Sequence, residues 1–238
     1  MFFRYDFHNH SCLSPCGDND MTPYNFVNLA KIIGLDAVAL TDHNTCLNCP
    51  AAIKAGEEAG IMVIPGIELC TSEEVHVVCL FPDVEKALAF SDYVRKTMPP
   101  VKNREEIFGE QLIMNETDKI IGKEDLLLTT ASGIGLYQVV PLVSEYGGCA
   151  FPAHINRSSY SVIANLGGIS LDMGFNTAEL TPDADINEFY EKYPNLKKMK
   201  ILYNSDAHYL DKMNMNPKHL EVEKFDIQTI IDTIKHGG

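Results

Sequence analysis

Short β-prone runs, most of which end beside ionisable residues, are the feature that most constrains this chain of 238 residues. The runs are FRYDFH (3–8), DAVALTDH (36–43), IMVIPGIE (61–68), VHVVCLF (75–81), CAFPAH (149–154), NTAEL (176–180) and KILYNSDAH (200–208). Helix-like segments lie between most of them, so strands and helices alternate. This alternation is typical of a parallel sheet or barrel, and about seven strands predict an α/β fold of that class.

Helices are expected in the segments that separate these runs. The first, TPYNFVNLAKIIG (22–34), has Thr22 as an N-cap, Pro23 at the first helical position and Gly34 after the last turn. The remaining helices are expected at residues 50–60, 84–97, 136–147, 186–193 and 227–237.

Residues 98–135 interrupt the alternation. The segment begins near Pro99 and Pro100, and we expect a hairpin across 111–122 and a short helix across 123–132. We interpret it as an insertion that acts as a lid, and an excursion that only packs on the side of the barrel is an equally good interpretation. The length of the chain suits a single domain over residues 1–238 that carries this insertion.

The formal net charge of −14 bears on the partners of the chain. The 19 Lys and Arg residues form no dense basic block, so a nucleic-acid polymer is disfavoured as a partner. A small phosphorylated substrate is compatible with this charge, because bound cations outweigh distant surface carboxylates within a local site. The sequence does not indicate an oligomeric state.

No secretory signal or membrane span is evident. The opening MFFRYDFHNH is broken by Arg4 and Asp6, and no apolar run approaches the length of a transmembrane helix. We therefore expect a cytoplasmic protein with no membrane partner. The seven cysteines, an odd number, then indicate reduced thiols rather than a disulfide framework.

Four of these cysteines form short-spaced pairs. Cys12 and Cys16 are spaced as C-x3-C, and Cys46 and Cys49 as C-x2-C, so a structural zinc site built from all four is an alternative. It is the less favoured interpretation, because a domain of this size does not need a metal to stabilise its core. The other three cysteines lie in apolar runs and are expected in the core: Cys70, Cys79 and Cys149.

Histidines and carboxylates gather at the ends of the β-prone runs, where the functional groups of parallel α/β folds lie. A neutral imidazole offers one lone pair and a carboxylate can bridge two cations, so this mixture suits clustered divalent ions. The candidates are His8, His10, Asp18, Asp42, His43, Glu68, His76, His154, Asp206 and His208. His76 begins its run, which is compatible with a strand that runs against the others. His219 and His236 lie outside the pattern and are expected on the surface.

The order of these motifs resembles the PHP family, the polymerase and histidinol phosphatase domains. The matching stretches are HNH (8–10), TDHN (41–44), PGIE (65–68) followed by His76, AH (153–154) and SDAH (205–208), and together they span residues 3–208. The resemblance implies a distorted TIM-like (β/α)7 barrel. It also implies a centre of two or three divalent ions, up to a trinuclear one, containing zinc, manganese or iron.

The resemblance also implies a division of the ligands among the ions. One ion would take His8, His10, Glu68 and Asp206. Glu68 would bridge to a second ion held by His76 and His154, and a third would take Asp18, His43 and His208. Asp20 is close enough in sequence to compete with Asp18 for the last position.

The stretch AHINRSS departs from the family pattern, because Ile155 stands where a proline is usual, but Arg157 keeps a basic residue nearby. A guanidinium can hold two phosphate oxygens at once, so we expect Arg157 to bind a substrate phosphate; a surface salt bridge is the alternative. Asp206 or His208 can transfer protons, and Asp42 can orient a ligand.

These residues favour a metal-dependent phosphoesterase that hydrolyses a small phosphomonoester or nucleotide. A hydroxide shared between two ions would attack phosphorus, while the ions and Arg157 neutralise the phosphate oxygens. The alternatives are a metal-dependent amide or ester hydrolase and a metal-bearing module that only binds a ligand. The substrate itself and the choice of metal cannot be read from this sequence.

Overall fold

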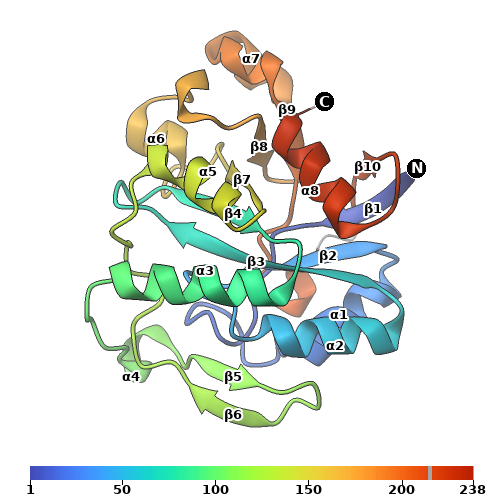
Figure 1. Ribbon diagram of the computed structural model, residues 1–238, viewed down its shortest axis with the longest axis vertical. Helices are drawn as coiled ribbons and strands as arrows, with labels where there is room; N and C mark the ends of the chain where they lie inside the picture. Colours follow the sequence, from blue (N-terminus) through green and yellow to red (C-terminus); the bar gives the residue numbers. More distant parts are fainter. Residues whose placement is uncertain (214–215, 238) are drawn as a thin grey trace.

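A curled β-sheet lies at the centre of the molecule, with helices packed along it (Figure 1). The computed structural model describes residues 1–213 and 216–237. The strands are β1 (Phe2–Asp6), β2 (Ala37–Leu40), β3 (Met62–Cys70), β4 (His76–Leu80), β5 (Leu112–Met114), β6 (Ile120–Lys123), β7 (Cys149–Pro152), β8 (Thr177–Leu180), β9 (Lys200–Tyr203) and β10 (His219–Glu221). The helices are α1 (Pro23–Ile32), α2 (Cys49–Ala59), α3 (Val84–Thr97), α4 (Glu105–Phe108), α5 (Leu136–Glu145), α6 (Val162–Leu166), α7 (Ile186–Lys192) and α8 (Ile227–His236).

The main sheet has six strands in the order β10-β1-β2-β3-β4-β7, and β8 pairs with β9 in a separate parallel pair. Strands β1, β2 and β3 are parallel, whereas β4 runs antiparallel to both β3 and β7. The amino end of β4 therefore lies beside the carboxyl ends of its neighbours. His76, the first residue of β4, pairs with Cys70 at the end of β3, which confirms that this strand runs against the others.

The β8–β9 pair closes the curve of the sheet through loops that follow the strands. After β9, the amide of Asp206 donates to the carbonyl of His8 (3.0 Å), and the amide of His10 donates to the carbonyl of Ala207 (2.9 Å). After β7, the amide of Ile155 donates to the carbonyl of Glu179 in β8 (2.9 Å). The expected distorted TIM-like barrel is confirmed, and β10 is a further edge strand that the sequence pattern did not indicate.

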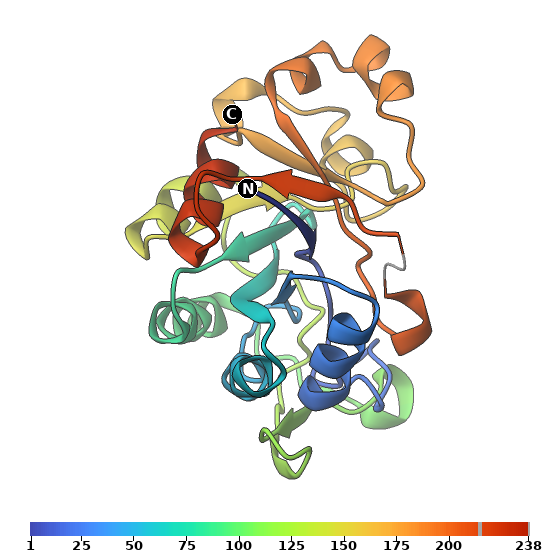
Figure 2. The ribbon, with the colours of Figure 1, turned by 90° about the vertical axis from the view of Figure 1, so that its right-hand side faces the viewer.

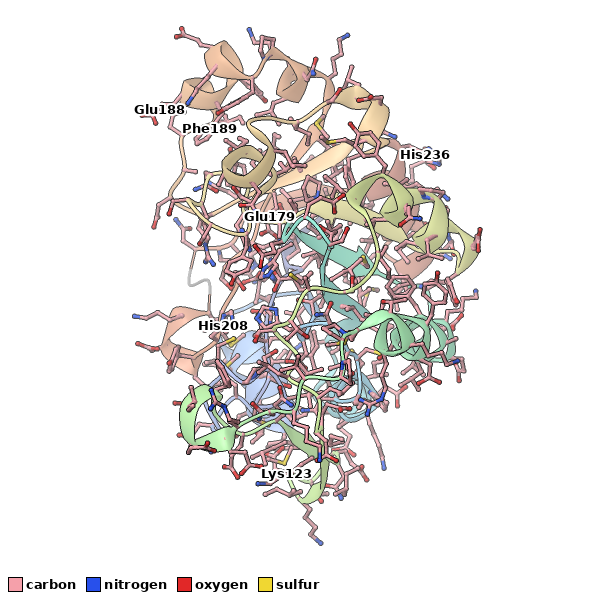
Figure 3. All side chains as sticks on the ribbon, turned by 90° about the vertical axis from the view of Figure 1, so that its left-hand side faces the viewer. Lys123, Glu179, Glu188, Phe189, His208 and His236 are labelled. Atoms are coloured by element: carbon pink, nitrogen blue, oxygen red, sulfur yellow. The ribbon has the colours of Figure 1, made fainter. Side chains whose placement is uncertain are left out.

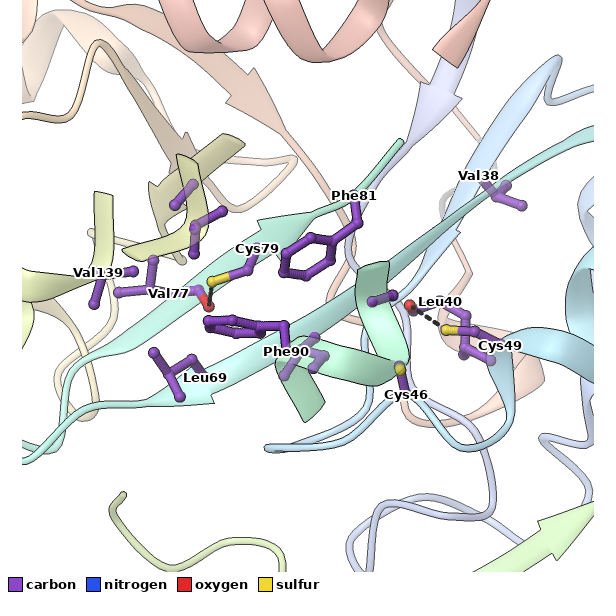
Figure 4. Close-up of a cluster of buried hydrophobic side chains, with 14 of the residues drawn as sticks. Val38, Leu40, Cys46, Cys49, Leu69, Val77, Cys79, Phe81, Phe90 and Val139 are labelled. Atoms are coloured by element: carbon purple, nitrogen blue, oxygen red, sulfur yellow. Dashed lines mark hydrogen bonds between the residues drawn. The ribbon is translucent and has the colours of Figure 1, made fainter. Parts of the chain in front are cut away.

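Alternating side chains of the strands fill two apolar layers. In β4, Val77 and Cys79 face the core that contains α3 and α5, whereas Val78 and Leu80 face the second core, which α8 covers. Figure 4 shows part of the first core, where Cys79 and Phe81 lie beside Phe90 of α3. This period of two fixes the register of the strands and thus the positions at which they end.

Local signals set the ends of the helices as expected. Thr22 caps α1, because its hydroxyl accepts a hydrogen bond from the amide of Asn25 (3.2 Å). Gly60 ends α2 with φ +69°, in the left-handed region that glycine adopts without strain. None of the helices within residues 1–213 and 216–237 combines the length and the apolar composition of a membrane span.

The segment 98–135 contains α4 and the β5–β6 hairpin, which lies at the end of the molecule opposite α7 (Figure 2). The hairpin is confirmed, but the helix expected over 123–132 is wrong. The side-chain amide of Gln111 donates to the carbonyls of Glu124 and Leu126 and accepts from the amide of Leu128, which holds this stretch extended. That the segment acts as a lid, and that residues 1–238 form one domain, remain predictions.

Replacing Ile231 with alanine should destabilise the protein, because this side chain of α8 is fully buried in the second core. We expect Ile231→Ala to lower the free energy of unfolding by about 2–5 kcal/mol. The matched control is Ile32→Ala in α1, whose side chain is 79% exposed and should change stability by less than about 0.5 kcal/mol. Urea denaturation of both variants measures the difference, and equal effects would contradict the assignment of α8 to a core.

Candidate metal centre

Histidines and carboxylates from distant parts of the sequence converge where the strands of the barrel end. Figure 3 labels two residues of this region, the buried Glu179 and the partly exposed His208, whereas His236 lies at the edge of the molecule in this view. Seven of the residues predicted as ligands are less than a tenth exposed: His8, His10, His43, Glu68, His76, His154 and Asp206. His208 is partly buried beside them, and His219 and His236 are exposed, as expected.

The carboxylate of Glu68, near the end of β3, lies at the centre of the group. Five imidazole nitrogens contact its two oxygens. They are His8 Nε2 (3.1 Å), His76 Nδ1 (2.8 Å) and His154 Nε2 (3.1 Å) at Oε1, and His10 Nε2 (3.3 Å) and His43 Nδ1 (2.9 Å) at Oε2. Both oxygens of Glu68 therefore face imidazole nitrogens, which suits a carboxylate shared between ions. The first predicted ligand set is divided between the two oxygens, with His8 at Oε1 and His10 at Oε2.

Asp206 is the second carboxylate of this cluster, which consists of His8, His10, His43, Glu68, His76, His154, Asp206 and His208. Its Oδ1 lies 3.2 Å from His8 Nε2 and 3.0 Å from His10 Nε2, and its Oδ2 accepts a hydrogen bond from Arg157 Nη1. Asp206 has φ +53°, and His154 has φ +30°; both values lie in the left-handed region that residues with a Cβ rarely adopt. Such conformations concentrate at functional sites, where surrounding contacts hold them.

The side chains form three overlapping groups whose ligand atoms lie within 4.8 Å of one another. The groups are His8, His10, Glu68 and Asp206; His43, Glu68 and His76; and His10, His43 and His208. The first group has the same members as the first predicted ligand set. In the second, His43 takes the place expected for His154, which still contacts Glu68; in the third, His10 takes the place expected for Asp18.

Buried polar atoms without hydrogen-bond partners test whether metal ions suit these residues. Among the described residues, four of the five such side-chain atoms belong to the cluster: His43 Nδ1, Glu68 Oε2, His154 Nδ1 and Asp206 Oδ1. His43 Nδ1 lies 2.9 Å from Glu68 Oε2, and Asp206 Oδ1 lies 3.0 Å from His10 Nε2, but these contacts lack the geometry of a hydrogen bond. Buried polar atoms almost always have a partner, and an ion is one of the accepted explanations when they do not. The mixture of imidazole and carboxylate also suits zinc, iron and manganese, so the residues fit the expected ions.

The tautomers of three imidazoles are set by acceptors other than the oxygens of Glu68 and the carboxylate of Asp206. His8 Nδ1 donates to the carboxylate of Glu179 (3.0 Å), His10 Nδ1 donates to Ser14 Oγ (2.9 Å), and His208 Nδ1 donates to the carbonyl of Asp206 (2.9 Å). In the neutral ring, Nε2 of each then carries the free lone pair. For His8 and His10 this atom faces the carboxylates of the cluster, which is the arrangement that a metal ligand requires.

Burial and neighbouring charges shift the pKa values of the cluster in opposite directions. Burial alone would raise the pKa of Glu68, but the charges of His76 and His8 hold it well below its usual range. Burial alone would lower the pKa of His8, but the neighbouring carboxylates, first Glu179 and then Asp206, raise it well above its usual value. The Glu68 carboxylate therefore stays anionic and requires positive charge close to it.

Glu179 is a functional residue that the sequence analysis missed. This fully buried carboxylate of β8 accepts hydrogen bonds from His8 Nδ1, from the amide of His154 (2.8 Å) and from Asn204 Nδ2 (2.7 Å). It thereby connects two predicted ligands that are 146 residues apart. The available signal was an acidic residue inside the apolar run NTAEL, where burial without a partner would be costly.

Asp42 is buried next to the cluster and reaches it through a serine side chain. It accepts hydrogen bonds from the amide of Ser11 (2.7 Å) and from Ser14 Oγ (2.7 Å), and the same Ser14 oxygen accepts from His10 Nδ1. Asp42 thus contacts His10 through Ser14, an arrangement that suits the expected role of orienting a ligand. Its role in catalysis, like the proton transfer expected of Asp206 and His208, stays a prediction.

The four cysteines weighed as a zinc site do not gather. Cys12 Sγ contacts the carbonyl of Leu112 (3.8 Å), Cys49 Sγ donates to the carbonyl of Leu40 (3.4 Å), and Cys46 lies in the first core (Figure 4). Cys16 is separate from them and belongs to the cluster of histidines. Cys70, Cys79 and Cys149 are buried among apolar side chains, as expected.

Cys16 Sγ lies 3.2 Å from His43 Nε2. Burial alone would raise the pKa of this thiol, but the charge of His43 and hydrogen bonds with His208 and His43 lower it to about 5. Asp18, two residues later, donates its amide to the carbonyl of His208 (2.9 Å), and its side chain accepts from the amide of Asp20 (2.8 Å).

Two adjoining cavities open beside the cluster. The first, of about 330 Å³, is lined by ligands of the cluster, by Thr129 from the insertion, and by Tyr160, whose ring stacks on His76 with centroids 4.7 Å apart. The second, of about 770 Å³, extends along Thr181, Tyr209 and Lys212. Four residues line both cavities: Cys16, Arg157, Asp206 and His208.

The motifs and this geometry agree with the comparison to known families, in which the model of the PHP domain matches residues 6–162. The chain belongs to the PHP domain family. A 5'-3' exoribonuclease of Salmonella typhimurium, Rnm, is 30% identical over 113 residues, which cover 45% of this chain and 37% of that protein. This chain therefore matches well under half the length of that curated relative.

Solved structures of PHP-type proteins share the fold. The lesion-specific endonuclease PfuEndoQ of Pyrococcus furiosus superposes with a TM-score of 0.73 and 20% identity, over 100% of this chain and 57% of the endonuclease. A putative metal-dependent phosphoesterase of Bifidobacterium adolescentis superposes with a TM-score of 0.60 and 17% identity, over 98% and 96% of the two chains.

The expectation that a nucleic-acid polymer is disfavoured as a partner is wrong. The similar proteins include an exoribonuclease and an endonuclease, which act on nucleic acid. The net charge of −14 is a property of the whole chain and does not describe the field inside one cleft. Divalent ions and a single arginine can make a local site attractive to phosphate on an acidic protein.

Replacing Glu179 with glutamine should weaken metal binding, because it removes the negative charge that holds the Nδ1 proton of His8. We expect Glu179→Gln to lower the affinity for zinc by about 10–100-fold, measured by competition with a chromophoric chelator. The matched control is Glu188→Gln in α7, an exposed carboxylate at the edge of the molecule (Figure 3). Equal affinities in the two variants would contradict a supporting role for Glu179.

Proposed function

We propose that this chain is a metal-dependent phosphoesterase whose ions are held around Glu68. The observation that carries the proposal is the buried Glu68 carboxylate, with five imidazole nitrogens in contact with its two oxygens. His8, His10 and Asp206 would hold one divalent ion with Glu68, and His76 and His154 a second. His43 and His208 would belong to a third, and zinc, manganese and iron all suit these ligands.

When bound, such ions lower the pKa of a coordinated water toward ~7 and neutralise the charge of a phosphate group. The residues of the chain supply the arrangement that this chemistry needs. Glu68 would link the first and second ions, which would occupy the two inner positions of the centre. The hydrogen bonds that His8 and His10 donate to Glu179 and Ser14 keep their Nε2 lone pairs directed toward Glu68 and Asp206. Burial of these groups strengthens their interactions, because the surroundings have a low dielectric constant.

Arg157 is the candidate for binding the substrate phosphate. Its guanidinium pairs with Asp206 Oδ2, while 42% of its side chain remains exposed, and it lines both cavities. A phosphate at this boundary would lie beside the cluster and within reach of the fork of guanidinium donors. The arginine would then hold the phosphate oxygens while the leaving group extends into a cavity.

The substrates that we propose are nucleotide phosphate esters, including the end of a nucleic-acid strand. The similarity to an exoribonuclease supports this class. The cavity of about 330 Å³ beside the wider one of about 770 Å³ supports a substrate that extends on both sides of Arg157. A small phosphomonoester or free nucleotide, as expected from the sequence, would occupy only part of this space.

Arg157→Ala should lower kcat/KM for phosphate esters by about 10²–10³-fold, because it removes a charged donor aimed at the phosphate. The metal content of the variant should stay unchanged. Arg104→Ala is the matched control, since Arg104 lines neither cavity. The assay compares bis(p-nitrophenyl) phosphate, a mononucleotide and a 5'-phosphorylated oligonucleotide with p-nitrophenyl acetate. Full activity of Arg157→Ala on the phosphate substrates, or hydrolysis of the acetate alone, would contradict the proposed function.

Divalent ions should stabilise the folded chain, because the cluster forms only when distant segments come together. At a free zinc concentration of 100 times Kd, the free energy of unfolding should rise by about 2.7 kcal/mol. Glu68→Gln removes the charge shared by the two inner positions and should abolish most of this gain. Thermal unfolding with and without zinc measures it, and an equal gain in the wild type and the variant would place zinc binding elsewhere.

A further inference from the structure

Cys16 is the side chain at the cluster that the proposed function leaves without a role. Its Sγ lies 3.2 Å from His43 Nε2 and also contacts the side chain of His208. The thiol lines both cavities, so it is accessible to ions and substrates that enter either of them. Cys16 thus lines the cavities next to the group formed by His10, His43 and His208.

The backbone around Cys16 is folded tightly enough to keep the thiol in this place. The amide of Ser14 donates to the carbonyl of Ser11 (3.0 Å), and the amide of Gly17 donates to the carbonyl of Ser14 (2.8 Å). A Cβ at Gly17 would lie only 2.4 Å from the carbonyl oxygen of Ser11, so only glycine permits this turn. The hydrogen bond from the Asp18 amide to the carbonyl of His208 ties the end of the loop to the cluster.

The imidazoles beside Cys16 point independently to an ion. Ligand atoms of His10, His43 and His208 lie within 4.8 Å of one another, and the rings of His10 and His208 stack with centroids 4.0 Å apart. His43 is only 5% exposed; its Nδ1 faces Glu68 Oε2 at 2.9 Å without a hydrogen bond, while its Nε2 faces Cys16 Sγ at 3.2 Å, so the ring lies between the two. This group contains no carboxylate, unlike the other two, so an ion held there would lack an anionic ligand from its own members.

The carboxylates expected to fill that position, Asp18 and Asp20, form no ion pair with these imidazoles among the described residues. The side chain of Asp18 accepts a hydrogen bond from the amide of Asp20. Within the described residues, Asp18, Asp20 and Cys16 all lie outside the three metal-ligand groups, so direct contacts with the imidazoles decide among them. Asp20 and Cys16 are both exposed residues, but Cys16 Sγ lies 3.2 Å from His43 Nε2 and lines both cavities with His208. A thiolate is a strong ligand for zinc and a poor one for manganese, which prefers oxygen ligands.

We propose that the Cys16 thiolate, rather than Asp18 or Asp20, completes the third metal position with His43 and His208, and that this position selects zinc over manganese. The inference rests on the proposed metal-dependent function, because it assumes that the two inner positions are also filled. It adds a sulfur ligand to a centre otherwise built from nitrogen and oxygen. The outer ion would therefore differ chemically from the inner ions.

Cobalt substitution of the metal-free protein tests this proposal, because a thiolate bound to Co²⁺ gives a near-ultraviolet charge-transfer band. The wild type should show the band, and Cys16→Ser should lose both the band and one equivalent of cobalt. Asp18→Asn should keep both, as should Cys12→Ser, whose thiol contacts Leu112 instead of the cluster. Circular dichroism checks that each variant is folded.

X-ray absorption of the zinc-loaded wild type tests the same point without a variant. It should show a sulfur atom at about 2.3 Å from part of the zinc. Binding of cobalt and zinc without any sulfur signal would overturn the role of Cys16 and leave the phosphoesterase proposal intact. Loss of an ion in Asp18→Asn but not in Cys16→Ser would overturn it as well. A protein that binds neither metal would overturn both proposals.

Discussion

The buried negative charge of Glu68 is the constraint on which the rest of the structure depends. An isolated carboxylate in the interior costs several kcal/mol, and it is tolerated only when positive charge and hydrogen-bond donors surround it. Here the compensation comes from five imidazoles, whose own burial disfavours their charged form. Divalent ions would resolve this conflict, because they supply positive charge while the imidazoles stay neutral.

The barrel brings these groups together because its strands end at one edge. The reversed strand β4 contributes its first residue to the same edge at which β3 contributes Glu68 near its end. The chain beyond β7 and β9 then turns through the left-handed conformations of His154 and Asp206, which direct both side chains to the cluster. Hydrogen bonds donated by imidazole Nδ1 atoms to Glu179, Ser14 and the carbonyl of Asp206 then set the tautomers of His8, His10 and His208.

The sequence predicted most of this arrangement, because strands, helix caps and ligands leave local patterns. The reversed direction of the strand after His76, for example, follows from a candidate ligand at its first residue rather than its last. The stretch 123–132 was predicted wrongly, because the side chain of Gln111, 13–17 residues earlier, takes up its backbone groups in place of helical hydrogen bonds. The positions of Cys16 and Glu179 depend on loop closure and on contacts across the barrel, for which spacing along the chain gives no measure.

The exclusion of nucleic acid failed for a related reason, since a net charge contains no information about where charges lie. The acidic residues are spread over the chain, whereas Arg157 and the imidazoles lie together beside the cavities. A cluster that concentrates cations can bind a polyanion that the rest of the surface repels. Local arrangement, and not composition, decides which substrates such a protein accepts.

Anomalous diffraction from crystals loaded with zinc tests the central claim most directly, because it locates ions independently of activity. The account predicts two anomalous peaks on opposite sides of the Glu68 carboxylate, each about 2.0–2.2 Å from one of its oxygens. One peak should also contact His8 and His10, and the other His76. Peaks only at surface residues, with the Glu68 carboxylate bound to no ion, would contradict the account.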